Sequence, residues 1–212
     1  MRILILTQPL RNNYGGLLQA YALQQILKSM GHDVVTDRDG IVRNLSLWNR
    51  TLHFIYHAIR FYILKDYRYY PYRYLFPSFN REKKAQKTIS INMKRFVDTY
   101  IDTVDFFTEN VESLSDKVKY YDAIVVGSDQ VWRWAYNAHI EWMYLSFVKD
   151  ESVKRIAYAA SIGIAYWDYP QDKSIMCATL AQQFNAISVR EKDAVSLVKE
   201  YLGMPAQYVL DP

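Results

Sequence analysis

Residues 1–37, MRILILTQPLRNNYGGLLQAYALQQILKSMGHDVVTD, decide the fold. Residues 2–6 form an apolar run that is typical of a strand buried on both faces of a parallel sheet. A loop rich in Asn, Gly and Pro follows, because these residues favour turns and interrupt strands. From Leu17 apolar residues recur every three or four positions until Gly31, a residue suited to end a helix, and a second strand begins soon after it. The stretch therefore predicts a strand, a helix and a second strand.

The alternation of strands and helices returns at Asp122. Four more strands are predicted at 123–126, 155–160, 186–189 and 206–210, with helices at 172–184 and 191–202. Strands that alternate with helices pair in parallel through right-handed crossovers. The sequence therefore predicts an α/β fold with a doubly wound, mainly parallel Rossmann-like sheet.

Residues from about 41 to 115 lack this alternation and predict a helical insertion. Apolar residues follow helical spacing between 47 and 63, a Tyr- and Arg-rich stretch broken by two prolines covers 66–77, and a second helical pattern covers 78–101. Between residues 43 and 95 there are twelve Lys and Arg residues and two acidic ones, although the net charge of the whole chain is only +4. This charge suggests an anionic partner for the segment. The alternative is a helical subdomain whose aromatic side chains pack together.

Length and composition indicate a globular protein. Half of the 212 residues are hydrophobic, which suits one large domain or one domain with an insertion. The single cysteine, Cys177, excludes an intramolecular disulfide framework and fits a reducing compartment. No stretch approaches the roughly 18 consecutive apolar residues of a transmembrane helix, and the apolar run at the N-terminus is too short for a signal peptide. We therefore expect a soluble, cytoplasmic protein.

Polar or small residues follow each of the predicted strands that lie near the centre of the fold. They are Asn12 to Gly16, Gly127 to Gln130, Ser161 with Gly163, and Ser188 with Arg190. In an open parallel sheet, ligands bind outside the carboxyl ends of the strands. The four loops are therefore expected to meet at one edge and form a ligand site.

The single residues of these loops allow a structural as well as a functional interpretation. Gly15 and Gly16 at a helix start would let backbone amides approach an anion, or would only allow close packing. Asp129 suits acid–base chemistry or a sugar hydroxyl, but Asp129 or Ser128 would also cap a helix that begins near Val131. Arg190 would clamp a phosphate or carboxylate, or pair with a structural acid.

Other residue types give weaker signals. Trp132 and Trp134 would stack on a sugar ring or belong to the core. His53 and His57 are four residues apart without an accompanying Glu, so metal binding is disfavoured. Cys177 lies in an apolar helical pattern without a neighbouring His, and we expect a core thiol.

Five blocks of the sequence resemble the polysaccharide pyruvyl transferase family. In order, they are residues 7–23 (TQPLRNNYGGLLQAYAL), 121–132 (YDAIVVGSDQVW), 155–163 (RIAYAASIG), 187–192 (ISVREK) and 209–212 (VLDP). The blocks cover both ends of the chain and follow the expected order. The segment from about 41 to 115 matches no motif of the family.

The resemblance implies transfer of a pyruvyl group from phosphoenolpyruvate to two hydroxyls of one sugar, as a ketal, in surface or exopolysaccharide biosynthesis. No cofactor and no metal are implied. The site residues that it implies are Asn13, Gly15, Gly16, Ser128, Asp129, Gln130, Trp132, Ser161 and Arg190. Asp129 would be the acid, base or hydroxyl ligand, and Arg190 an anion clamp. The partners are phosphoenolpyruvate and a sugar or oligosaccharide acceptor, which a lipid would carry if the enzyme works at the inner face of the membrane.

The family is also similar to two-domain glycosyltransferases of the GT-B type. Its members continue beyond the Leu-Asp-Pro block into a second α/β half that is expected to supply basic residues for phosphoenolpyruvate. By this resemblance residues 1–212 form an N-terminal Rossmann-like domain with the insertion at about 41–115. The chain alone, without the C-terminal domain, is expected to be inactive.

Two other functions remain open at the level of sequence. One is a GT-B-type glycosyltransferase domain that uses a nucleotide-sugar. The other is a non-catalytic module whose basic segment 43–95 binds an anionic lipid, an acidic glycan or, least favoured, a nucleic acid.

Overall fold

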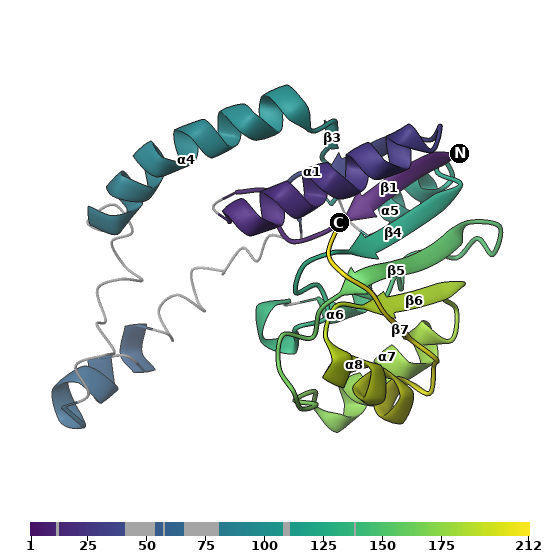
Figure 1. Cartoon of the computed structure of the whole chain (residues 1–212). Helices are drawn as coiled ribbons and strands as arrows, with labels where there is room; N and C mark the ends of the chain where they lie inside the picture. Colours follow the sequence, from purple (N-terminus) through teal and green to yellow (C-terminus); the bar gives the residue numbers. More distant parts are fainter. Residues whose placement is uncertain (12, 41–53, 57, 66–80, 108–110, 138) are drawn as a thin grey trace. The chain divides into compact units, whose positions relative to one another are not determined.

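A computed structural model describes residues 1–11, 13–40, 54–56, 58–65, 81–107, 111–137 and 139–212. Seven strands form one open, all-parallel sheet in the order β3-β2-β1-β4-β5-β6-β7 (Figure 1). The strands are β1 (Arg2–Leu6), β2 (Asp33–Asp37), β3 (Thr103–Val104), β4 (Ala123–Gly127), β5 (Lys154–Ala160), β6 (Ala186–Val189) and β7 (Gln207–Tyr208). The prediction of an α/β fold with a doubly wound, Rossmann-like sheet is therefore confirmed.

Helical segments connect these strands. They are α1 (Tyr14–Ser29), η1 (Ile59–Ile63), α4 (Arg81–Tyr100), α5 (Val111–Val118), η3 (Trp134–Tyr136), α6 (Ile140–Met143), α7 (Gln171–Ala181), α8 (Lys192–Leu197) and η4 (Val198–Leu202). The opening unit is β1–α1–β2, as predicted. Gly31 follows α1 with a φ of +86°, a backbone conformation that glycine adopts at least cost.

The order of the strands reverses its direction at β1. The chain moves from β1 outward to β2 and β3, then returns to place β4 on the other side of β1. In open parallel sheets the crevice outside the carboxyl ends of two such strands is where ligands bind. The fold therefore directs attention to the loops that follow β1 and β4.

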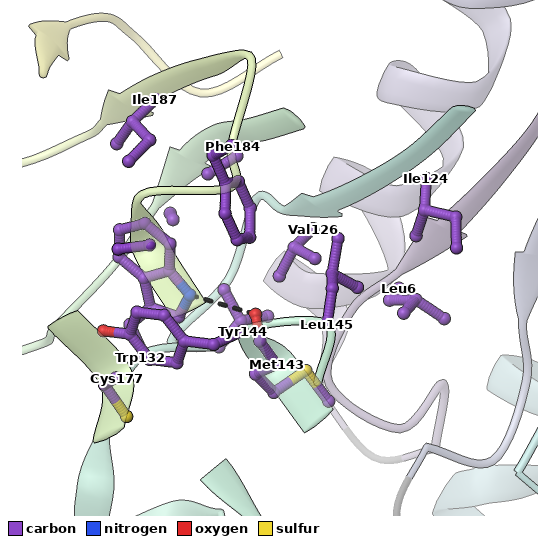
Figure 2. Close-up of a cluster of buried hydrophobic side chains, with 14 of the residues drawn as sticks. Leu6, Ile124, Val126, Trp132, Met143, Tyr144, Leu145, Cys177, Phe184 and Ile187 are labelled. Carbon is purple, nitrogen blue, oxygen red and sulfur yellow. Dashed lines mark hydrogen bonds between the residues drawn. The ribbon is translucent and has the colours of Figure 1, made fainter. Parts of the chain in front are cut away.

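Alternate residues of the central strands point to opposite faces of the sheet, as the geometry of a strand requires. Leu4, Leu6 and Val126 belong to the larger core, which also contains residues of α5, α6, α7, α8 and η4. Figure 2 shows part of this core between β4 and the segments that follow it. Ile5 and Val125 face the other side, where Leu23 of α1 packs against the sheet.

The chain divides into two compact units, one of residues 1–41 with 93–212 and one of residues 42–92. The first contains the whole sheet and also α5, so β3 and the first part of α5 belong to it although they fall inside the range predicted for the insertion. The second contains η1 and the first part of α4. Residues 47–53 and 57 of the predicted helical pattern at 47–63, and the whole Tyr- and Arg-rich stretch at 66–77, lie outside the described residues.

Among the described residues, we find no helix with both the length and the apolar character needed to cross a bilayer.

Candidate active site

Two loops meet at the carboxyl edge of the sheet, where the strand order reverses. Asn13 precedes α1 in the loop after β1, and Asp129 follows β4. The side-chain Nδ2 of Asn13 donates a hydrogen bond to Asp129 Oδ2 at 3.3 Å. Asn13 has the extended backbone of a helix N-cap, yet its side chain makes no capping hydrogen bond to α1. Its amide therefore serves the contact with Asp129 instead of the helix.

Asp129 is a largely buried carboxylate held by donors. Only 8% of the residue is exposed. Its Oδ1 accepts a hydrogen bond from the backbone N–H of Gln130 at 2.7 Å, and Arg190 Nη2 lies 3.8 Å from the same oxygen. All of these contacts suit a carboxylate that accepts hydrogen bonds. The helix near Val131 that Asp129 or Ser128 would cap is not formed, because a turn occupies residues 131–132.

Gly16 gives this carboxylate the space it occupies. A Cβ atom at Gly16 would lie 2.9 Å from Asp129 Oδ2 and 3.1 Å from Asn13 Nδ2, whereas a Cβ at Gly15 would meet only Asn13 Oδ1 at 3.5 Å. The carboxylate of Asp129 thus stands beside the N-terminus of α1, where the positive end of the helix dipole favours an anion. Asp129 is thus an anion that the protein itself places beside Gly16, and the binding of an anionic ligand by the backbone amides of Gly15 and Gly16 stays a prediction.

Arg190 links three carboxylates at this edge. Its Nε donates to Glu191 Oε1 at 3.2 Å, and its Nη1 donates to the backbone oxygen of Ser128 at 3.3 Å and to Asp211 Oδ2 at 3.4 Å. Its Nη2 approaches Asp129 only to 3.8 Å, and within the described residues the structure shows no hydrogen bond from that nitrogen. Arg190 thus pairs with structural acids, which is one of the two interpretations that the sequence allows. Its Nη2, 3.8 Å from Asp129, lies where it would donate to a ligand oxygen beside that carboxylate.

Glu191, Asp211 and Gln19 complete the cluster, and sequence reasoning gave none of them a role. Asp211 Oδ2 accepts a second hydrogen bond from Gln19 Nε2 of α1 at 2.7 Å. Glu191 Oε1 also accepts a hydrogen bond from Ser161 Oγ. Glu191 and Asp211 lie in the last two blocks that resemble the family, at 187–192 and 209–212. The position of Glu191 next to Arg190 is the one signal in the sequence that points to this cluster.

Ser128 and Ser161 are brought to the same edge but face inward. Both are buried, and Ser128 Oγ has no hydrogen-bond partner within the described residues. Gly127, just before Ser128, has a φ of +134°, and a Cβ there would lie 1.9 Å from the backbone oxygen of Tyr158 on β5. Only glycine therefore allows β4 and β5 to stay this close where the site begins.

Gln130 is held in the loop by backbone contacts. Its carbonyl oxygen accepts a hydrogen bond from Gln8 Nε2 at 2.8 Å, which ties the loop after β4 to the loop after β1. The side chain of Asn137 bonds the same loop through the carbonyl oxygens of Val131 and Arg133. These bonds fix the backbone on which Asp129 stands.

Trp132 is not placed to bind a substrate, and that prediction needs correction. The residue is 0% exposed, and its ring stacks on Tyr144 with centroids 4.8 Å apart. Its Nε1 donates to the backbone oxygen of Met143 at 3.2 Å, as Figure 2 shows. Burial in the core, which the sequence allowed as the alternative, takes the ring out of reach of a ligand. Trp134 is partly buried and packs against Tyr169.

Cys177 and the possible metal ligands have the following places. Cys177 is buried in the main core, as predicted, and burial raises the pKa of its thiol to about 12. In the part of the chain that the structure describes, no group of three or more His, Cys, Asp or Glu side chains is arranged to hold a metal ion. His53 and His57 lie outside those residues.

Comparison with known proteins bears on this site. A sequence model of the family described as polysaccharide pyruvyl transferase matches residues 13–212. These include the whole of the Asp129 cluster, by which we mean Asn13, Gln19, Asp129, Arg190, Glu191 and Asp211. The match covers nearly the whole chain and lends no support to the expectation that the chain alone is inactive. No curated protein and no solved structure matches the chain. By the extent of the family match, the chain belongs to the polysaccharide pyruvyl transferase family.

Proposed function

We propose that the Asp129 cluster is the acceptor wall of a pyruvyl transferase site. In this proposal the protein moves a pyruvyl group from phosphoenolpyruvate to two hydroxyls of one sugar, as a cyclic ketal in surface or exopolysaccharide biosynthesis. Membership of the family implies a transferase with a sugar or polysaccharide acceptor. The single observation that carries the proposal is the buried Asp129 carboxylate, 3.8 Å from Nη2 of Arg190, at the crevice of the sheet.

The overall reaction sets the groups that the site must supply. The methylene carbon of phosphoenolpyruvate gains a proton, which leaves a positive charge on the neighbouring carbon that bears the phosphate. The first sugar hydroxyl attacks this cationic carbon. The carbon–oxygen bond to phosphate then breaks, and the second hydroxyl attacks the same carbon to close the ketal. The two hydroxyls lose two protons, of which one goes to the methylene carbon and one leaves with phosphate. Phosphoenolpyruvate is itself the activated donor, so the scheme needs no cofactor.

Asp129 is assigned to the sugar hydroxyls. A carboxylate that already accepts hydrogen bonds from Asn13 and from the Gln130 amide is suited to accept one more from a hydroxyl and then its proton. Arg190 Nη2, 3.8 Å away, would donate to the same hydroxyl oxygen or to a carboxylate oxygen of the donor. In that second case Arg190 acts as the predicted anion clamp without giving up its bonds to Glu191 and Asp211.

The net negative charge of the Asp129 cluster favours binding of the sugar acceptor over binding of the phosphate donor. Asp129, Glu191 and Asp211 surround one guanidinium, so three carboxylates face a single positive charge. An excess of acceptors suits the donor groups of a polyol better than it suits a phosphate dianion.

We place the reaction in the cytoplasm, where a lipid-linked acceptor would bring the protein to the inner face of the membrane.

The experiment that tests the proposal follows phosphate release by ³¹P NMR. The purified protein, as its gene encodes it, is incubated with phosphoenolpyruvate and a panel of oligosaccharide acceptors. Release of phosphate that depends on acceptor, with a ketal methyl signal in the ¹H spectrum of the product, is the expected result. Asp129→Asn should lower kcat by about 100-fold or more, because a general base contributes about that factor. Transfer of sugar from a nucleotide-sugar with no response to phosphoenolpyruvate would instead favour the glycosyltransferase alternative.

A further inference from the structure

A second polar cluster lies in the loops that follow β4 and β5. Arg133 comes four residues after Asp129, and Asp168 lies between β5 and α7. The hydroxyl of Tyr169 donates to the backbone oxygen of Trp132 at 2.7 Å and so joins the two loops. Four residues span at most about 14 Å of extended chain. One glycan could therefore contact both Asp129 and Arg133.

Arg133 and Asp168 form an ion pair with unused hydrogen-bonding capacity. Arg133 Nη1 lies 3.4 Å from Asp168 Oδ2, and both side chains are largely buried. Arg133 Nη1 and Asp168 Oδ1 nevertheless have no hydrogen-bond partner among the described residues. A buried polar atom without a partner costs about 1–3 kcal/mol. Neighbouring protein atoms cover both atoms, so they bond a ligand only when the partly exposed side chains turn outward. A sugar hydroxyl both donates and accepts and therefore suits both atoms.

Exposed tyrosines accompany this ion pair. Tyr136 is 66% exposed and Tyr166 is 62% exposed. The guanidinium of Arg133 lies 5.9 Å from the ring centroid of Tyr136. Tyr166 lies two residues before Asp168 in the same loop. In that loop Tyr169 packs against Trp134 and stacks on Trp167 with centroids 4.1 Å apart. Exposed aromatic side chains such as Tyr136 and Tyr166 provide contact area at low entropic cost.

We propose that Arg133, Asp168, Tyr136 and Tyr166 form a subsite for a neutral sugar residue of the acceptor glycan. The pair of opposite charges leaves the subsite neutral, which distinguishes it from a phosphate or carboxylate site. Its place beside the Asp129 cluster makes the bound sugar a neighbour of the one that is modified. The inference rests on the proposed function for the identity of the acceptor, but binding of glycan at this surface does not require pyruvyl transfer.

The experiment measures binding alone, on a glycan array of neutral hexose oligosaccharides with one to five residues. For those that bind, affinity of the wild-type protein should rise about tenfold when a second residue is added, which corresponds to roughly 1.4 kcal/mol. Tyr136→Ala and Tyr166→Ala should each lose most of this gain. Tyr120→Ala is the matched control, because Tyr120 is 68% exposed but precedes β4 at the opposite edge of the sheet. Thermal unfolding checks that all three variants fold.

The outcomes separate this inference from the proposed function. Length-dependent binding that Tyr136→Ala and Tyr166→Ala abolish, without any release of phosphate from phosphoenolpyruvate, supports the subsite and contradicts the proposed function. Pyruvyl transfer whose rate is the same for short and long acceptors, in the wild type and in both variants, contradicts the subsite alone. An array that retains no glycan, or variants that bind as the wild type does, overturns the subsite.

Discussion

Gly15 and Gly16 are neighbours in the first turn of α1, but only Gly16 lies against Asp129. The Cβ of Gly16→Ala would lie 2.9 Å from Asp129 Oδ2, so the carboxylate has to move. We expect kcat/KM for pyruvyl transfer to fall about 10- to 100-fold, which corresponds to roughly 1.4–2.7 kcal/mol of transition-state stabilisation. Gly15→Ala is the matched control, because its nearest contact at 3.5 Å is ordinary and it gains the same helix propensity. Equal rates for the two variants would show that the position of Asp129 does not limit catalysis.

Asp37 predicts how stability depends on pH. The residue is buried at the end of β2, and the amides of Gly40 and Phe106 donate to its carboxylate at 2.8 and 2.9 Å. Burial raises the pKa of Asp37 from 3.8 to about 6, although the two hydrogen bonds act to lower it. Because the folded state binds the proton more tightly than the unfolded state, the free energy of unfolding should fall as pH rises from about 4 to about 6. The contribution is on the order of 3 kcal/mol across this window.

Asp37→Asn should remove that dependence, as measured by urea unfolding at several pH values between 4 and 7. It should also lower stability at every pH, since the amide group of Asn would face one of the two backbone donors. Asp172→Asn, at an exposed carboxyl in α7, is the control and should keep the wild-type slope. An unchanged slope in Asp37→Asn would assign the pH dependence to another group.

Single residues show what could and could not be predicted from the sequence. Asn13 and Asp129 were predicted because polar residues at the ends of neighbouring parallel strands must meet. The prediction that Trp132 binds substrate is wrong because aromatic residues in a loop suit a sugar site and a core equally well. Only the packing of Trp132 against Tyr144 shows that it belongs to the core. The role of Asp211 depends on contacts over 21 residues to Arg190 and 192 residues to Gln19, which no local pattern contains.

At the scale of elements, the long and periodic segments were predicted best. The helix after Gly15 and the strands near the centre of the sheet have strong apolar patterns, and each was found within a few residues of its predicted bounds. Shorter pieces were less predictable, because tertiary contacts decide them. β3, a strand of two residues paired with β2, lies where a helical insertion was expected. The predicted helix at 191–202 is α8 followed by η4, a change of hydrogen bonding that side-chain spacing does not reveal.

The segment after β7 behaves as an element of its own and carries a prediction. Val209 bonds β6 through its amide, Tyr158 of β5 donates to the backbone oxygen of Leu210, and Asp211 accepts from Gln19 of α1. The segment thus crosses from the edge of the sheet to α1 (Figure 1). There Asp211 also accepts a hydrogen bond from Arg190. Gln19→Ala should therefore release it, because the 2.7 Å hydrogen bond to Asp211 is lost.

The measurement is hydrogen exchange at the amide of Val209, which donates to Val189 and should exchange about 2- to 10-fold faster for a lost bond of roughly 0.5–1.5 kcal/mol in the same segment. Gln25→Ala, elsewhere on α1, should leave this amide unchanged. If Asp129 depends on Arg190 as proposed, Gln19→Ala should also raise KM for the acceptor. Wild-type exchange in Gln19→Ala would mean that the contacts to Val189 and Tyr158 hold the segment without help from α1.

The whole molecule combines two units of different character. Residues 42–92 contain most of the basic, Tyr-rich segment, whereas the unit of residues 1–41 and 93–212 contains the sheet and the Asp129 cluster. The suggestion that the basic segment contacts an anionic lipid or glycan remains a prediction of its charge. The candidate site does not depend on that prediction, because all of its residues belong to the unit that contains the sheet.

The sheet predicts where the molecule is most resistant to opening. β1 and β4 lie at the centre, each is paired on both sides, and all five residues of β4 are buried. β7, by contrast, has two exposed residues at the edge. In native-state hydrogen exchange at low denaturant, the amides of Ile5 and Val125 should exchange only through global unfolding, while Tyr208 should exchange through local opening. A site used for catalysis must be held rigidly, and Asn13 and Asp129 follow the two most enclosed strands. If the amides of β4 exchanged as fast as those of β7, β4 would not hold the loop of Asp129 in a fixed position. That result would contradict the proposed role of Asp129 as a positioned base.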